Sequence, residues 1–165
     1  LTVVYKGETY TASSPLMATP DIVKTEQKLK PGFGGKDVYE IKFFFQDNPS
    51  ENNFYLGGVK NSTIAYPEYG VISDEFTQGN LMFIVYHEEL KKGDIVDYTL
   101  QGITEKYNNF MFKLISTSGV EGNGPFSIPQ ASAIRGNIVN QTNSNNFPLG
   151  FFHLSEMDSG SLIIQ

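Results

Sequence analysis

One stretch of the chain decides the fold that we expect: VYEIKFFFQ, residues 38–46. Successive residues of a β-strand point to opposite faces of a sheet, so Tyr39, Ile41, Phe43 and Phe45 share one apolar face. The opposite face mixes charged and apolar residues. This combination is typical of an antiparallel sheet with one face on a core and the other partly in water. Residues 38–46 are therefore predicted to form a core strand.

Strand patterns also lie on both sides of this stretch. Ile22–Leu29 has no strongly apolar face, which favours an edge strand. Leu81–His87 is apolar on both faces and is predicted to be buried on both. The remaining expected strands are Thr2–Tyr5 and Thr9–Ala12 (a hairpin), Phe54–Val59 with Ser62–Tyr66, Ile95–Gly102, and Leu149–His153 with Ser161–Ile164 (a final hairpin around Asp158-Ser159-Gly160).

A different period appears after residue 103. Thr104 stands where an N-cap is expected, with Glu105 in the first turn. Apolar residues then recur at helical spacing: Tyr107, Phe110, Met111, Leu114 and Ile115. Gly119 is the expected C-terminal stop. One amphipathic helix near residues 104–118 is therefore predicted, and its apolar stripe must cover an open face or end of the sheet.

Many short strands, one helix and a long irregular region over residues 116–146 favour a mainly β protein. We predict an antiparallel β-sandwich with immunoglobulin-like topology. Residues 13–165 are assigned to this sandwich domain, and residues 1–12 to a hairpin at its edge or to a neighbouring β domain.

Composition excludes several classes of protein. The 165 residues carry a formal net charge of −6 and contain no cysteine and two histidines. An acidic chain without a Lys/Arg cluster is a poor partner for nucleic acid or anionic lipid. Thiolate chemistry is impossible, and no apolar run approaches the roughly 20 residues that span a bilayer.

Two groups of carboxylates are candidates for chemistry. Asp47, Ser50, Glu51 and Asn52 offer oxygen ligands for Ca²⁺, but Pro49 interrupts the spacing and the EF-hand pattern is missing, so a polar turn is preferred. Whether Asp47 and Glu51 bind a metal stays open.

Asp74 and Glu75 resemble the paired carboxylates of a glycoside hydrolase, with Glu88, Glu89 or Asp94 as alternative second groups. Capping of the turn at residues 75–79 by Asp74 is the favoured explanation. His87 and His153 have no Ser in a nucleophile elbow to activate. No catalytic residue, metal or cofactor is predicted, and the chain is not expected to be an enzyme.

Tyr66 and Tyr69 are the predicted ligand-binding residues. They flank Pro67 and Glu68, and a proline-fixed turn can present two amphipathic rings to a sugar or a protein at low entropic cost. The alternative is that both rings only pack over the end of the sheet.

Several motifs follow one another in an order that is familiar from a known family. They are the Tyr5–Ala12 hairpin, Asp47-Asn48-Pro49 through Tyr55, Ser73–Gly79, Gly93–Val96, Ile103–Tyr107, Pro125–Ser127, Gly136–Ile138 and Leu149–Phe152. Together they resemble a family of Bacteroidota outer-membrane lipoproteins of unknown function, whose genes commonly lie beside those of TonB-dependent receptors. The resemblance covers nearly the whole chain.

The resemblance implies a cell-envelope accessory protein. Members usually begin with a lipobox cysteine and a separate immunoglobulin-like or regulatory β domain, so this chain resembles their C-terminal portion, with residues 1–12 as the closing strands of the earlier domain. The implied location is the outer membrane, facing the cell surface or periplasm, through a lipid anchor that this chain lacks. A TonB-dependent receptor is the implied partner, with a glycan or peptide as a possible ligand. We expect a non-enzymatic binding or docking module; the alternatives are an independent surface glycan-binding module and, last, a carbohydrate-active enzyme using Asp74.

Overall fold

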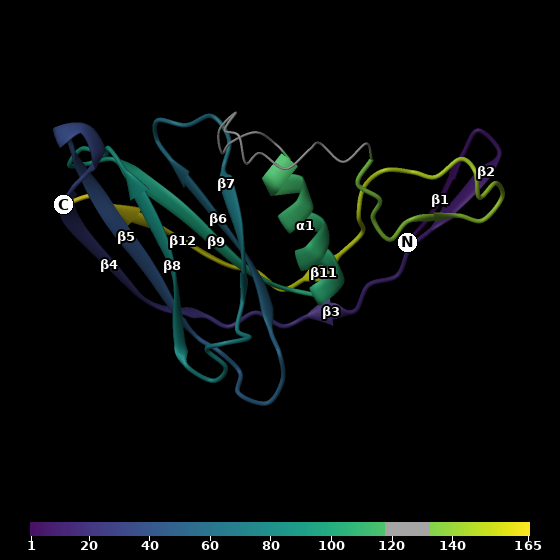
Figure 1. Ribbon diagram of the computed structural model, residues 1–165, viewed down its shortest axis with the longest axis horizontal. Helices are drawn as coiled ribbons and strands as arrows, with labels where there is room; N and C mark the ends of the chain where they lie inside the picture. The colour runs from purple at the N-terminus through teal and green to yellow at the C-terminus, as the bar shows by residue number, and fades with distance from the viewer. Residues whose placement is uncertain (118–132) are drawn as a thin grey trace.

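Two antiparallel sheets packed face to face form the main body of the protein in the computed structural model, which describes residues 1–117 and 133–165 (Figure 1). One sheet has the order β4-β5-β8, and the other has the order β12-β9-β6-β7. Their bounds are β4 Ile22–Pro31, β5 Asp37–Gln46, β6 Phe54–Asn61, β7 Glu68–Ser73, β8 Leu81–Glu88, β9 Ile95–Ile103 and β12 Asp158–Ile163. The predicted mainly β sandwich is thereby confirmed.

The immunoglobulin-like topology stays a prediction. Constant-type immunoglobulin domains place their fourth strand beside the fifth, in the sheet of the first two strands. Here β7, the fourth strand of the sandwich, pairs with β6, the third, over the register Phe54↔Ser73 to Val59↔Glu68. The predicted edge strand at residues 22–29 is confirmed, because β4 lies at the margin of its sheet.

The apolar face of β5 fills the space between the sheets. Ile41, Phe43 and Phe45 have no exposed surface. The ring centroid of Phe43 lies 4.5 Å from that of Tyr98 on β9, and Phe45 lies 4.9 Å from Tyr55 on β6. The core strand predicted from residues 38–46 is therefore confirmed, and its inward row holds the two sheets together.

The prediction that Leu81–His87 is buried on both faces is wrong. Met82 and Tyr86 are buried, but Leu81, Phe83 and Val85 remain 44–51% exposed. The reason is that the second face of β8 looks outward, and within residues 1–117 and 133–165 no sheet or helix packs over it.

The strand predicted at Ser62–Tyr66 is also wrong. Buried Asn61 turns the chain there, because its side-chain Oδ1 accepts hydrogen bonds from the backbone N–H groups of Thr63 (2.6 Å) and Ile64 (3.2 Å). Such local bonds compete with a strand ladder. The Asn61 amide also donates to the Tyr86 hydroxyl at 2.7 Å, so the turn is tied to the opposite sheet.

The predicted final hairpin is absent from the described residues. The segment expected to be its turn, Asp158-Ser159-Gly160, lies inside β12, which pairs with β9. Gly160 allows this pairing because a side chain there would overlap the ring of Tyr98. The short strand β11 (Leu154–Ser155) pairs instead in parallel with β3 (Leu16–Met17).

A small separate sheet stands at the other end of the molecule (Figure 1). The hairpin of β1 (Thr2–Tyr5) and β2 (Glu8–Thr11) is confirmed; Lys6 and Gly7, with φ of 50° and 80°, form its turn. Its third strand is β10 (Val139–Asn140), which pairs with β2. A 3₁₀ turn, η1 (Phe33–Gly35), joins β4 to β5 where a glycine-rich turn was expected.

The predicted helix is present as α1 (Glu105–Thr117). Thr104 caps it, since its Oγ1 accepts a hydrogen bond of 3.2 Å from the Tyr107 backbone N–H. The helix contacts β7 and β6 and so covers part of the outer face of the four-stranded sheet. Ser118, the predicted stop Gly119 and the motif Pro125–Ser127 lie outside the described residues. No helix in the described ranges is long and apolar enough to span a membrane.

We predict that Gly102→Ala destabilises the fold. A Cβ at residue 102 of β9 would overlap the backbone carbonyl oxygen of Ala18, where the chain between β3 and β4 crosses the sheet. Overpacking of this kind costs about 1–3 kcal/mol of unfolding free energy. Urea denaturation measures the loss.

The matched control is Gly70→Ala on β7, where nothing lies within 4 Å of the added atom. This variant should stay within about 0.5 kcal/mol of the wild type. Equal stabilities of the two variants would contradict the close approach of the Ala18 backbone.

Candidate binding site

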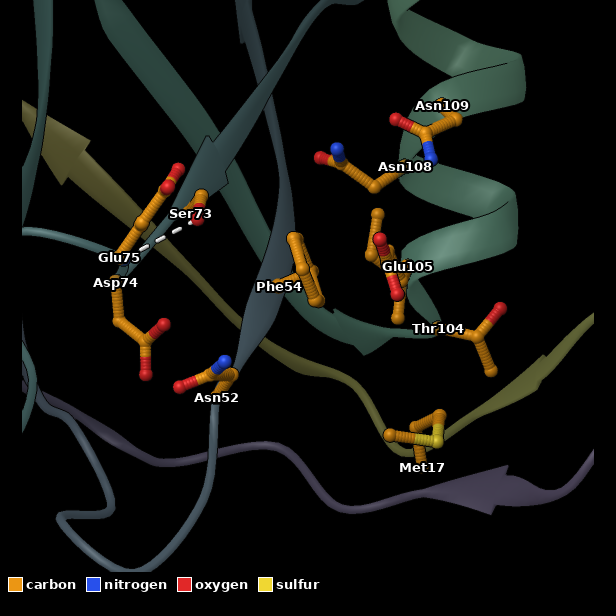
Figure 2. A pocket seen from close by; sticks show the side chains of 11 residues that line it. Met17, Asn52, Phe54, Ser73, Asp74, Glu75, Thr104, Glu105, Asn108 and Asn109 are labelled. Carbon is orange, nitrogen blue, oxygen red and sulfur yellow. Dashed lines mark hydrogen bonds between the residues drawn. The ribbon is translucent and has the colours of Figure 1, made fainter.

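A pocket of about 600 Å³ lies between the first turns of α1 and one end of the four-stranded sheet (Figure 2). The strand register produces it. Phe54, at the start of β6, pairs with Ser73 at the end of β7 and with Ile103 at the end of β9. Because these strands are antiparallel, their ends meet at one place, where the next residues of the chain enter the loops and the helix.

The lining of the pocket combines apolar, neutral polar and acidic side chains. Phe54, Ile103 and Met17 supply apolar surface. The neutral polar lining residues are Asn52, Ser73, Thr104, Asn108 and Asn109. Three carboxylates complete the lining, from Asp74, Glu75 and Glu105. No Lys, Arg or His belongs to the lining described, so the pocket carries negative charge without an internal counter-charge.

Asp74 is the most unusual lining residue, because its side chain is fully buried. Its Oδ2 accepts a hydrogen bond of 2.8 Å from the Asn53 backbone N–H. Its Oδ1 has no hydrogen-bond partner among the described residues. Figure 2 shows the Asp74 carboxylate and the Asn52 side chain pointing toward one another at one end of the pocket. Leaving a buried carboxylate oxygen unpaired costs free energy.

Asp74 was expected to cap the following turn, and only its backbone does so. Its carbonyl oxygen accepts a hydrogen bond of 2.7 Å from the Thr77 N–H, which closes the turn. The Glu75 N–H donates instead to the Ser73 Oγ at 3.2 Å. The Asp74 side chain is therefore used across the sheet end, toward the loop before β6.

A second buried carboxylate holds this end of the sandwich rigid. Asp47 Oδ1 accepts from the Tyr55 hydroxyl (2.6 Å), and Oδ2 accepts from the Gly79 N–H (2.8 Å). Gly79, with φ of 73°, packs directly on Pro49. Burial, followed by the bond to Asp47, raises the pKa of Tyr55, so its hydroxyl stays a donor. The loops at residues 47–53 and 74–80 are thereby joined.

The structure does not bring the candidate Ca²⁺ ligands into one cluster. Both oxygens of Asp47 accept protein hydrogen bonds, and the exposed Glu51 accepts from the Asn48 side-chain amide at 3.3 Å. Within residues 1–117 and 133–165, no group of three or more His, Asp or Glu side chains is placed to hold a metal ion. The expectation of no metal and no cofactor stays a prediction.

The pocket lining does not include the other carboxylates that the sequence offers as partners of Asp74, which are Glu88, Glu89 and Asp94. Glu89 forms an ion pair of 2.9 Å with Lys36, and Asp94 accepts from the Lys91 N–H. The carboxylate that does join Asp74 and Glu75 is Glu105, which sequence reasoning placed only in the first helical turn. Knowledge of how the ends of β6, β7 and β9 pair would have placed Glu105 at this pocket.

Tyr66 and Tyr69, the predicted ligand-binding residues, lie outside the pocket. Tyr66 is 82% exposed in the turn that leads into β7, and Tyr69 is 44% exposed within β7. The Tyr69 ring lies over Gly58, where a Cβ would come within 2.9 Å of it. Since Asp74 follows the opposite end of β7, the two tyrosines form a separate candidate surface.

An aromatic cluster fixes α1 beside the pocket. The Tyr107 ring stacks on His153 with centroids 4.0 Å apart, and Tyr107 and Phe110 both contact Phe151, at 5.0 and 5.3 Å. His153 Nδ1 is buried and has no partner among the described residues. Burial lowers the pKa of His153 below its ordinary value, so the ring is held neutral in the folded protein.

No protein-family model matches the chain, and no similarity to a curated protein or to a solved structure was found. The resemblance to outer-membrane lipoproteins of Bacteroidota is not tested by these comparisons and stays a prediction.

We predict that His153 makes stability fall in mild acid. The folded state binds its proton less tightly than the unfolded chain, whose histidine pKa is about 6.5, so unfolding takes up a proton. The free energy of unfolding should therefore decline as the pH drops below about 6.5 and level off below the folded pKa. Urea melts at closely spaced pH values measure this slope.

The comparison variant is His153→Phe, which keeps an aromatic ring on Tyr107 and cannot be protonated. Its slope between about pH 6.5 and about pH 5 should be smaller than that of the wild type. Identical slopes would show that His153 is not held neutral by burial.

Proposed function

We propose that this protein is a non-enzymatic binding or docking module of the bacterial cell envelope that acts with an outer-membrane TonB-dependent receptor. The envelope setting and the identity of the receptor rest on the family resemblance. The observation that supports binding is the pocket between α1 and the ends of β6, β7 and β9, which is preformed and lined by polar side chains.

The directions of the carboxylates favour binding over hydrolysis. A glycoside hydrolase needs two carboxyl groups that face one scissile bond from opposite sides, at about 5–10 Å. Figure 2 shows Asp74 and Glu75 extending in opposite directions from the end of β7, while Glu105 lies across the pocket on the helix. Neighbouring carboxylates that diverge suit multiple contacts with a ligand better than acid and nucleophile roles on one atom.

The rigidity of the sheet end also supports a docking role. The bonds from Tyr55 and Gly79 to Asp47 join the two loops beside the pocket, so a partner meets a surface that needs little ordering on binding. Function on loops that a rigid scaffold positions is the usual arrangement in β-sandwich proteins.

The receptor test uses the native protein in its own membranes. Mild detergent extraction followed by affinity isolation of this protein should recover a TonB-dependent receptor in a fixed ratio, identified by mass spectrometry. Recovery of the protein alone, with the receptor intact in the same extract, would contradict docking on that receptor.

The second candidate function is an independent glycan-binding module that uses Tyr66 and Tyr69. The exposure of Tyr66 favours it, because a free aromatic face can stack on a sugar ring. A glycan array with the wild type should then give signals that Tyr66→Ala and Tyr69→Ala each reduce, by about fivefold or more for a lost stacking contact. Phe112→Ala, an exposed aromatic on the helix, serves as control. Equal signals from all four proteins would rule out a tyrosine platform.

A further inference from the structure

We propose that an extended segment of a partner protein adds as a strand to the free edge of β8, antiparallel to it, and covers the inward face of β7. The segment that fits carries apolar side chains at alternate positions and a lysine or arginine near its N-terminal end. This inference rests on the proposed docking function and names the chemistry of the partner.

The two sheets of the sandwich differ by one strand, and the difference falls at one margin. At the other margin β4 lies against β12, since the Ile22 N–H donates to the Asp158 carboxylate at 2.6 Å. β8 lies over β6, because a Cβ at Gly57 would come within 2.6 Å of the Ile84 side chain. Among the described residues, β7 therefore has no strand of the three-stranded sheet opposite it. We call this place, beside β8 and over β7, the open strand position.

The inward face of β7 is uncovered at the open strand position. Glu68 pairs with Val59, a buried core residue, and so lies on the same inward face. Gly70 pairs with Gly57 and shares this face, because alternate residues of a strand point the same way. Both Glu68 and Gly70 are nevertheless exposed, and nothing lies within 4 Å of a Cβ built at Gly70. An added strand would find open space here.

The backbone of β8 offers hydrogen bonds to the same place. The Asp47 N–H donates to the Asn80 carbonyl at 3.2 Å, directly beyond the pair Gln46↔Leu81. Bonded and non-bonded pairs alternate in an antiparallel ladder, so the even-numbered residues of β8 bond to β5. The odd-numbered residues then point their N–H and C=O groups to the free edge. Within residues 1–117 and 133–165, β8 has no second neighbouring strand to receive them.

The free edge of β8 lacks the usual protection against strand pairing. Residues 81–86 (LMFIVY) contain no charge, proline or glycine, and their register with β5 is continuous. β4, the other margin of the same sheet, carries Lys24, Lys28 and Lys30, and its register shifts after Ile22. Proteins blunt exposed edges with such charges and irregularities. An open edge in a sheet whose other edge is blunted is suited to strand addition by a partner.

The residues around the open strand position define the segment that fits. An inward side chain opposite Ile84 would lie over Gly70, where the open space favours a bulky apolar group. Two residues closer to the N-terminus of the segment, an inward side chain would lie opposite Tyr86. Burial and, more weakly, the nearby charges of Glu68 and Glu88 raise the pKa of the Tyr86 hydroxyl, which places both carboxylates at this end. A lysine or arginine there would meet two opposite charges.

The test uses the full chain and a capped peptide, acetyl-Thr-Lys-Val-Phe-Thr-Ile-Thr-amide, which has the expected pattern. Its phenylalanine would pair with Ile84 and its lysine with Tyr86. Hydrogen exchange of single amides, followed by NMR, reports strand addition directly. A saturating amount of peptide should slow exchange at the Phe83 and Val85 amides at least tenfold. The Met82 and Ile84 amides, which already bond to β5, should change by less than about twofold.

Two N-methylated peptides provide a matched comparison. In the predicted register the N–H of the peptide valine donates to β8, while that of the following phenylalanine points away from β8. Methylation of the valine nitrogen should therefore weaken binding at least tenfold, and methylation of the phenylalanine nitrogen should weaken it by no more than about threefold. A third peptide with glutamate in place of lysine should bind about threefold to tenfold more weakly, because it meets like charges.

Variants of the protein locate the segment over β7. Gly70→Leu fills the open space and should weaken the peptide at least tenfold, while its thermal melt matches that of the wild type. Glu68→Gln removes an exposed charge and should weaken it by about threefold to fivefold. The matched control is Glu75→Gln, an exposed glutamate beyond the other end of β7, which should leave affinity unchanged. The Glu68→Gln comparison keeps the test decisive if Gly70→Leu alters the fold.

The outcomes separate this inference from the proposed function. Unchanged exchange of the Phe83 and Val85 amides at about 1 mM peptide would overturn strand addition even if the receptor copurifies. Equal losses from the two N-methylated peptides would overturn it as well. Protection of these amides that rises with protein concentration alone would show that a second copy takes the edge, and would overturn the partner segment. Strand addition of the peptide without receptor copurification would support the inference and contradict only the identity of the partner.

Discussion

The inward row of β5 is the constraint on which the rest of the structure depends. Ile41, Phe43 and Phe45 are completely buried, and each side chain of this size stabilises the fold by roughly 1.5–3 kcal/mol through burial. Because the rings of Phe43 and Phe45 meet Tyr98 and Tyr55 of the opposite sheet, they fix how the two sheets pack on one another. The positions of the strand ends, and of every loop that follows them, depend on this packing.

The two buried aspartates at one end of the sandwich, Asp47 and Asp74, differ in how many of their oxygens are hydrogen-bonded. Asp47 receives hydrogen bonds on both oxygens and so joins two loops at little net cost. Asp74 receives only one, from Asn53, and its other oxygen is buried without a partner among the described residues. Proteins leave few buried polar atoms unpaired, and those few call for an explanation. At this end of the sandwich, the hydrogen bonds of the described residues explain the burial of Asp47 but not that of Asp74 Oδ1.

The outer faces of the two sheets are covered in different ways. On the three-stranded sheet, two phenylalanine rings lie under ammonium groups: the Lys42 Nζ stands 4.5 Å from the centroid of the exposed Phe83 ring, and the Lys24 Nζ stands 5.4 Å from that of the half-buried Phe44 ring. Glu40 binds Lys30 at 2.7 Å, which lowers the pKa of its carboxyl group. Lysine side chains therefore cover part of the apolar surface that this face presents to water. On the four-stranded sheet, α1 covers part of the outer face, and the pocket lies beside the first turns of this helix.

The amino-acid sequence by itself determined the core strand, the edge strand β4, the first hairpin and the start of α1. These depend on local signals: alternation at residues 38–46, and the Thr104 cap followed by the 3.6-residue period. It misplaced the strand at residues 62–66, because the side chain of Asn61 bonds to the backbone N–H groups of Thr63 and Ile64 and turns the chain. It misplaced the final hairpin because residues 158–160 pair with the distant strand β9. Only the tertiary structure decided the site. Asp74, Glu75 and Glu105 are up to 31 residues apart, and the antiparallel register of β6, β7 and β9 is what brings them to one pocket.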